Sequence, residues 1–119
     1  MTGPVTFVNV LDIDPDTRDQ VIAHLREGAA TVFSRCAGFV SLELLLSTDG
    51  TRIINVARWD SAEHLSAAQS APGAAAYARR TAELSSARPG VFMTIATFAE
   101  AGSGREEAGR EEWAIPDSN

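Results

Sequence analysis

Asn55 and Trp59 are the residues of this sequence whose types and spacing are best suited to chemistry. They lie in the alternating stretch 53–59, so a strand would place both side chains on one face, beside apolar neighbours. The amide and the indole N–H on that face could donate hydrogen bonds to an oxyanion. A buried polar group without a partner costs roughly 1–3 kcal/mol, so Asn55 requires a partner in the protein or in a ligand. Spacing alone leaves a structural role in the core equally open.

The strand that carries these two residues follows other regular elements. Alternation predicts a first strand over residues 5–13, with Phe7 and Asn9 on one face. Asp14 is a suitable N-cap, and an apolar stripe at helical spacing predicts a helix from there to about residue 36. A second strand is expected over residues 39–47, where alternation places Val40 on the face of Leu42 and Phe39 on the other face. Asp49-Gly50 predicts a hairpin that leads into a third strand over residues 51–59.

The second half of the chain repeats this order. Asp60 as N-cap and Glu63 three residues later form a capping-box pattern, which predicts a helix to about residue 71. Pro72-Gly73 separates it from a helix over residues 74–84, and Arg88-Pro89-Gly90 predicts a turn before a last strand over residues 91–99. The order β-α-β-β-α-β predicts an α+β, ferredoxin-like fold, a four-stranded antiparallel sheet with helices on one face.

Both faces of several predicted strands are apolar, whereas helices cover only one face. A second copy of the sheet would cover the other, so we expect a homodimer. Residues 1–100 form the predicted domain. Residues 101–119 are predicted to be a flexible or partner-docking tail, with Trp113 and Ile115 as its apolar anchor.

The composition excludes several classes of protein. The 119 residues are 45% hydrophobic and 22% charged, as in one globular domain, and the net charge of -6 argues against a nucleic-acid partner. Cys36 is the only cysteine, so no internal disulfide can form. With neither a secretory leader nor an apolar run of membrane-spanning length, we expect a cytoplasmic protein without a membrane partner. His24 and His64 are isolated from other ligand-type residues, so no metal site is expected.

Three pieces in order carry a resemblance to a known family. They are Gly38-Phe39, the Asp49-Gly50 hairpin, and Asn55 followed four residues later by Trp59. Over residues 5–99 the chain resembles the antibiotic biosynthesis monooxygenase family of dimeric α/β barrels, in particular its quinone-forming members. The resemblance implies a cofactor-independent monooxygenase that uses molecular oxygen, without metal or flavin, to oxidise an anthrone or phenol of aromatic polyketide type to a quinone.

The resemblance also implies site residues. Carried over by position, the catalytic Asn, Trp and Arg of the family fall on Asn55, Trp59 and Arg79. The family's catalytic Tyr falls on Leu65, which is a departure because leucine cannot donate a proton. Tyr77 could enter the pocket from the following helix. The expected substrate-binding residues are Phe7, Asn9, Leu65 and Tyr77.

Of three alternatives, the residues argue against the first and leave the other two open. A haem-degrading branch of the same fold uses an Asn, a Trp and an axial His; Asn9 and Trp59 match, but the helix over residues 74–84 has no histidine. A polyketide cyclase or isomerase would use the same pocket with a titratable base. Because Leu65 stands where the family has a tyrosine, a non-catalytic protein that binds a small ligand is the third alternative. The candidate bases for a cyclase are His24, His64, Asp12 and Glu43.

Overall fold

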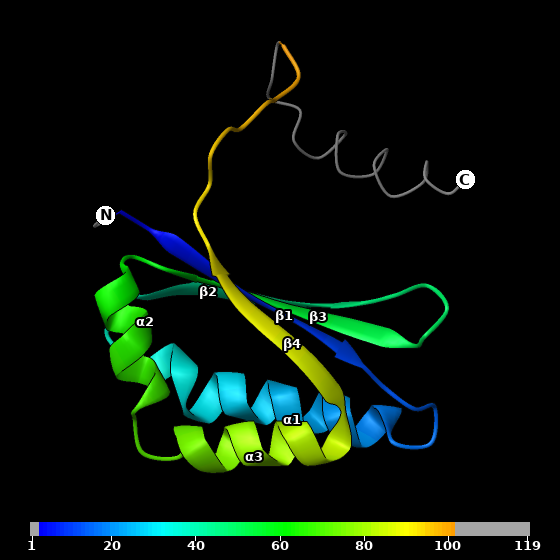
Figure 1. Cartoon of the computed structure of the whole chain (residues 1–119). Helices are drawn as coiled ribbons and strands as arrows, with labels where there is room; N and C mark the ends of the chain where they lie inside the picture. The colour runs from blue at the N-terminus through cyan, green and yellow to red at the C-terminus, as the bar shows by residue number, and fades with distance from the viewer. Residues whose placement is uncertain (1–2, 102–119) are drawn as a thin grey trace.

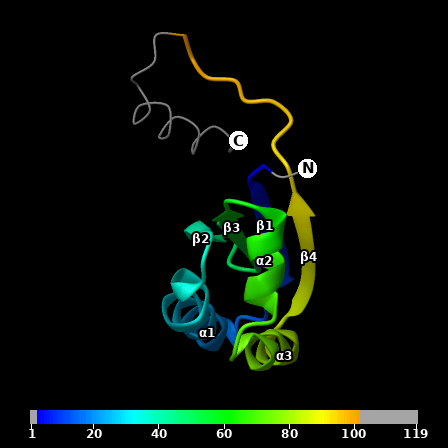
Figure 2. The ribbon, with the colours of Figure 1, turned by 90° about the vertical axis from the view of Figure 1, so that its left-hand side faces the viewer.

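The computed structural model describes residues 3–101, which form a four-stranded antiparallel sheet with helices on one face (Figure 1). The ferredoxin-like α+β architecture is therefore confirmed. The strand order is β2-β3-β1-β4. Helices α1 and α3 lie side by side along the sheet, and α2 stands at one end of it (Figure 2). The elements are β1 (Val5–Asp12), α1 (Arg18–Thr31), a 3-10 turn η1 (Phe33–Arg35), β2 (Phe39–Leu46), β3 (Arg52–Trp59), α2 (Ala62–Gln69), α3 (Ala74–Leu84) and β4 (Ser86–Phe92).

The two central strands, β1 and β3, pair in a register that sets the site. Val5 lies opposite Trp59 and Asn9 opposite Asn55, so the odd-numbered residues of both strands share the face under the helices. Their apolar members fill two buried clusters. One cluster holds Val5, Ala57, Trp59, Leu65 and Ala68, and the other holds Leu11, Ile13, Val21, Leu25 and Ile53. The face assignment predicted for these strands is confirmed.

Helix α1 is shorter than predicted at both ends. It begins at Arg18, with Thr17 as N-cap, because Asp14 is used in a preceding turn where its carbonyl accepts the Thr17 N–H at 3.0 Å. It ends at Thr31, where side-chain hydroxyls, in place of backbone N–H groups, donate to carbonyls of the last turns. Thr31 Oγ1 donates to the Glu27 carbonyl at 2.8 Å, and Ser34 Oγ donates to the Ala30 carbonyl at 3.1 Å. The remaining predicted helix is replaced by η1.

Helix α2 starts one residue later than the capping box predicted. Ser61 is the N-cap, and its hydroxyl accepts the His64 N–H at 3.1 Å. Asp60 still belongs to the strand pairing, because its N–H donates to the Gly38 carbonyl at 2.9 Å. Its carboxylate binds His64 Nδ1 at 2.6 Å instead of capping the helix.

Two strand assignments were wrong. A bulge at Val40 brings Phe39 opposite Trp59, on the face of Leu42, where alternation had placed it on the other face. Arg88-Pro89-Gly90 is not a turn, because β4 runs through it. β4 is an edge strand, where proline is tolerated because only one side of the strand has a neighbour to pair with.

The chain leaves the sheet after Phe92, where the last strand had been expected to continue (Figure 1). Within residues 3–101 no helix is both long and apolar enough to cross a lipid bilayer. Apart from Ala101, the predicted tail with Trp113 and Ile115 lies outside the described residues.

Candidate active site

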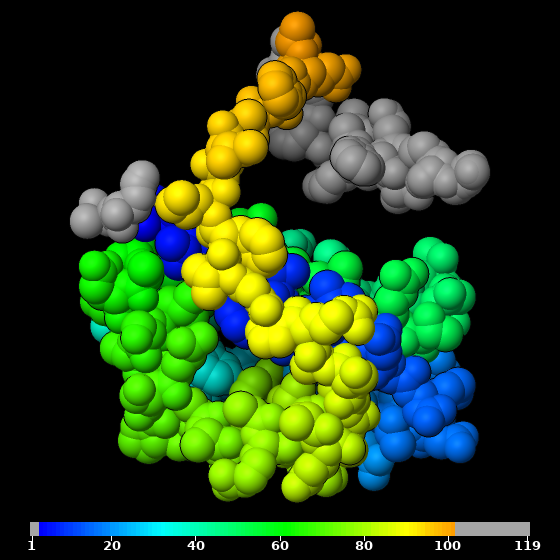
Figure 3. All heavy atoms as spheres, viewed as in Figure 1, coloured from blue at the N-terminus to red at the C-terminus, as the bar shows by residue number. Residues whose placement is uncertain are grey.

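A cavity of about 380 Å³ lies between the helix-facing side of the sheet and helices α2 and α3. The space-filling view shows the surface hollowed between α2, β4 and α3 (Figure 3). Its wall is mostly apolar, with a few polar side chains that converge on it, as is typical of small-molecule sites. The lining residues are Phe7, Asn9, Phe33, Leu42, Asn55, Ala57, Trp59, Leu65, Gln69, Ala74, Tyr77, Ala78, Thr81, Ala82, Ala87 and Pro89.

The sheet side of the cavity carries two amides. Asn9 and Asn55 are cross-strand partners, and Asn55 is only 5% exposed. The Oδ1 atoms of both are buried and have no hydrogen-bond partner among residues 3–101. Since leaving a buried polar atom unpaired costs roughly 1–3 kcal/mol, two such atoms in one cavity indicate that a ligand is meant to hydrogen-bond there.

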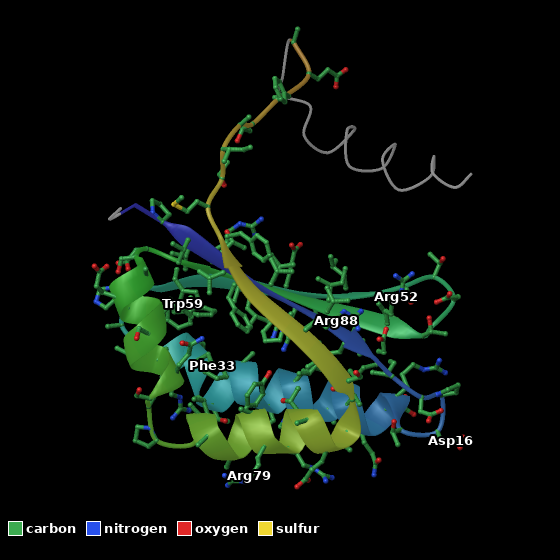
Figure 4. All side chains as sticks on the ribbon, viewed as in Figure 1. Asp16, Phe33, Arg52, Trp59, Arg79 and Arg88 are labelled. Atoms are coloured by element: carbon green, nitrogen blue, oxygen red, sulfur yellow. The ribbon has the colours of Figure 1, made fainter. Side chains whose placement is uncertain are left out.

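Trp59 lines the cavity from β3. Its side chain is 2% exposed, and its ring meets that of Phe39 edge-on, with ring centres 5.5 Å apart. Leu65 of α2 belongs to the same buried cluster. Figure 4 shows Trp59 pointing from β3 into the space beneath the sheet. The bulge at Val40 therefore contributes to the site, because it turns Phe39 toward the indole and fixes its orientation.

Tyr77 forms the opposite wall, on α3. Its ring stacks on His24 with centres 4.6 Å apart and meets Phe33 edge-on at 5.0 Å. Burial raises the pKa of Tyr77 to about 12, while Thr81 and Asn55 beside it act in the opposite direction. The hydroxyl therefore stays protonated at neutral pH and is available as a donor.

Behind Tyr77, a polar contact joins α1 to α3. Thr81 Oγ1 donates to the Tyr77 carbonyl at 2.8 Å and lies 2.9 Å from His24 Nε2. Since the single hydroxyl proton is used on the carbonyl, His24 Nε2 must carry the proton that joins the two side chains. Burial lowers the pKa of His24, so the imidazole is neutral at physiological pH.

The structure brings six of the seven predicted site residues together and leaves one out. Arg79 is exposed and points from α3 away from the sheet (Figure 4). The reason is helical spacing: α3 faces the cavity with Tyr77 and, four residues on, Thr81, whereas position 79 lies on the far side. Thr81 was not predicted, although its spacing from Tyr77 could have indicated it. The six that line the cavity are Phe7, Asn9, Asn55, Trp59, Leu65 and Tyr77.

The candidate bases for a cyclase lie elsewhere. Asp12 binds Arg88 at 2.8 Å, and this hydrogen bond lowers the pKa of its carboxyl. Glu43 lies opposite Val56, on the sheet face away from the helices, and is exposed. No carboxylate, imidazole or cationic side chain is among the residues that line the cavity in the described part of the chain. Within that part, no group of three or more His, Cys, Asp or Glu side chains could hold a metal ion.

The family model for antibiotic biosynthesis monooxygenase matches residues 4–80, which is more than half of the chain. The chain belongs to this family. Tetracenomycin-F1 monooxygenase from Streptomyces glaucescens is 34% identical over 56 residues, 47% of this chain and 50% of that protein, so the match spans about half of this curated relative.

Solved structures agree with the family assignment. SnoaB from Streptomyces nogalater, described as a cofactor-independent oxygenase, is 31% identical, with 82% of this chain and 99% of SnoaB covered at a TM-score of 0.69. A second SnoaB structure, of a variant with one asparagine replaced by alanine, matches with a TM-score of 0.76 and 27% identity over the same shares of the two chains.

Proposed function

We propose that this protein is a cofactor-independent monooxygenase that oxidises an aromatic polyketide, of anthrone or phenol type, to a quinone with molecular oxygen. The observation that carries the proposal is the pair of buried amide oxygens, Oδ1 of Asn9 and of Asn55, which have no hydrogen-bond partner in the described part of the chain and lie in the otherwise apolar cavity beside Trp59. A volume of about 380 Å³ suits a ligand of a few fused rings. The names of tetracenomycin-F1 monooxygenase and SnoaB support the same chemistry.

The residues suit a reaction in which the substrate supplies the electrons. An anthrone or phenol that loses a proton becomes an electron-rich anion, which can reduce oxygen directly. The Asn55 Nδ2–H and the Trp59 Nε1–H are donors that would hold this anion, while Oδ1 of Asn9 and of Asn55 would accept a hydrogen bond from a hydroxyl of the substrate. Hydrogen bonds to a charged group contribute roughly 1.5–3 kcal/mol, so each could favour ionisation about ten- to a hundredfold. The apolar wall excludes water from the anion. Overall, a CH₂ group and O₂ become a carbonyl and water.

The proposal is tested by incubating metal-free protein with dithranol, a hydroxylated anthrone, under air and under nitrogen. Quinone should form in an oxygen-dependent reaction faster than without protein, and Asn55→Ala should lower the rate at least tenfold. Quinone formation at the protein-free rate would contradict the proposal. Tight binding of dithranol without turnover would favour a non-catalytic ligand-binding protein. No observation favours a cyclase that uses a carboxylate or an imidazole as its base, because neither lines the cavity in the described part of the chain.

We also propose that the active form is a homodimer. The sheet face opposite the helices carries a group of apolar side chains from all four strands, and a large apolar patch on a monomer often marks an interface. The register places these side chains on that face: Val8, Val10, Leu45, Ile54, Val56 and Phe92. Sedimentation equilibrium should give twice the mass of the chain, and Val56→Glu, at the centre of the patch, should give monomers. A monomeric parent protein would contradict the proposal.

A further inference from the structure

The α2 wall of the cavity offers no proton donor where the resembled enzymes have a tyrosine. Leu65 occupies that position, is 5% exposed and packs with Trp59 in a buried cluster. Oxygen addition to a carbanion nevertheless produces a peroxide anion, which must be protonated before the O–O bond can break. The Asn and Trp side chains of the sheet stabilise charge but are far too weakly acidic to supply a proton.

Tyr77 offers a hydroxyl from the opposite wall. It lines the same cavity, and its side chain lies near enough to Asn55 for the amide to influence its ionisation. A hydroxyl on this wall would therefore be close to a substrate oxygen held by the sheet amides. Tyr77 lies on α3, across the cavity from Leu65. It could therefore donate a proton to the substrate from α3, as a tyrosine at position 65 would from α2.

Residues of α1 and η1 hold the ring of Tyr77 in place. Gly28 of α1 leaves the space that the ring occupies, because a Cβ there would overlap ring atoms Cδ1 and Cε1. His24 stacks on the ring at 4.6 Å, and Phe33 of η1 meets it edge-on at 5.0 Å. A phenol held by contacts from α1 and η1 is preorganised, as a proton donor must be.

We propose that Tyr77 is a catalytic residue that gives the proton to the terminal oxygen of the substrate peroxide; this inference rests on the proposed function. The substrate loses a proton to bulk solvent and binds as its anion, and the carbanion forms a C–O bond to O₂, which is reduced to the peroxide level. Tyr77 then protonates the outer oxygen. Its phenolate next takes the remaining C–H proton as the O–O bond breaks, which leaves a carbonyl and hydroxide. The hydroxide takes up a proton from solvent to give water.

The acidity of Tyr77 suits this cycle. Its pKa of about 12, raised by burial, keeps the hydroxyl protonated in the resting protein. The phenolate left after proton donation is correspondingly a strong base, able to remove the acidified C–H proton of the hydroperoxide. One hydroxyl thus serves first as acid and then as base, and it is restored at the end of each turnover.

The test compares Tyr77→Phe with the parent protein, with dithranol under air as the probe. The variant should lower kcat about a hundredfold, the usual contribution of a proton donor, with KM almost unchanged. More than one O₂ should be consumed per quinone, because the C–O bond of an unprotonated peroxide breaks to give superoxide and a substrate radical, which reacts with further O₂. Thermal unfolding checks that the variant is folded. The matched control is Arg80→Gln on the solvent side of α3, which should keep the parent kcat.

A second variant tests whether proton donation, and not only the place of the Tyr77 ring, accounts for the effect. Leu65→Tyr in the Tyr77→Phe background should regain kcat and the ratio of one O₂ per quinone, provided that its unfolding shows that the larger side chain is accommodated. Parent-like kcat and ratio in Tyr77→Phe, or a change in KM alone, would overturn the inference and leave the proposed function standing. Failure of the parent protein to form quinone would instead count against the proposed function.

Discussion

Asn9 and Asn55 lie directly opposite each other on β1 and β3, and the amide oxygen of each is buried without a hydrogen-bond partner in residues 3–101. Folding this pair therefore costs free energy that the rest of the core has to offset. Protein sites that bear such a cost usually recover it when a ligand binds. The pair makes the cavity a place where stability and function oppose one another.

Replacing Asn55 by leucine should separate these two properties. Because leucine has a similar volume and needs no partner, the free energy of unfolding should stay unchanged or rise, while quinone formation falls at least tenfold. Urea unfolding and dithranol turnover measure the two effects. Asn9→Leu is the matched cross-strand control for stability. A loss of stability in Asn55→Leu would show that the amide serves the fold.

Trp59→Phe removes the indole N–H and keeps an aromatic ring against Phe39. We expect turnover to fall about tenfold through loss of one hydrogen bond to the substrate anion. The free energy of unfolding should fall by roughly 1–2 kcal/mol, because the smaller ring leaves a cavity in the buried cluster. Turnover at the parent rate, at saturating dithranol, would argue that Trp59 is only part of the core.

Gly28→Ala should displace Tyr77. Alanine favours helix, but its Cβ would overlap the ring, so we expect a net loss of about 1–3 kcal/mol in unfolding free energy. In a Tyr77→Leu background the same substitution should cost much less, because the ring is gone. A double-mutant cycle from chemical unfolding measures this coupling. An equal loss of unfolding free energy in both backgrounds would contradict the inference that Gly28 makes room for the Tyr77 ring.

His24 should make stability depend on pH below 6.5. Burial lowers the pKa of His24 in the folded protein, so the unfolded chain binds its proton first as the pH falls. The free energy of unfolding should therefore decrease as the pH falls from 6.5, the pKa of His24 in the unfolded chain, to the lower pKa in the folded protein. Above pH 6.5 the stabilisation that comes from neutral His24 is fully present. His24→Phe keeps a stacked ring and should flatten the dependence between pH 7 and 5. An unaltered slope in unfolding experiments would assign it to other groups.

Arg79→Gln distinguishes the family resemblance from the geometry. The resemblance implied a catalytic arginine at this position, whereas the side chain is exposed on the outer side of α3. An exposed substitution of this kind usually changes free energies by less than about 0.5 kcal/mol, so turnover should stay within about twofold of the parent. A fall of a hundredfold would mean that Arg79 reaches a cavity after all, for example that of a second subunit.

Much of the fold could be predicted because its information is local. Strict alternation in β1 and β3 placed Asn9, Asn55 and Trp59 on one face, and Pro72-Gly73 marked the start of α3. These patterns depend only on the periods of strand and helix. The catalytic roles assigned to Asn55 and Trp59 remain predictions, but their convergence in one cavity followed from the same periods.

What could not be predicted depended on distant parts of the chain. Arg88-Pro89-Gly90 has the composition of a turn, yet it is held extended by pairing with β1 and by the Arg88–Asp12 ion pair. The bulge that turns Phe39 toward Trp59 leaves no mark in the alternation of β2. Such features arise from tertiary contacts, which local propensity does not encode.

The α3 side of the cavity is built largely of alanine, at positions 74, 78 and 82, whereas the amides belong to the two central strands of the sheet. A single larger side chain on this helix would narrow the cavity without disturbing the paired strands. The alanines that set the width of the cavity thus lie on a different element from the amides that are proposed to hold the substrate anion. We expect a larger side chain at one of these three positions to change which substrates fit, while the amides and Tyr77 keep their places.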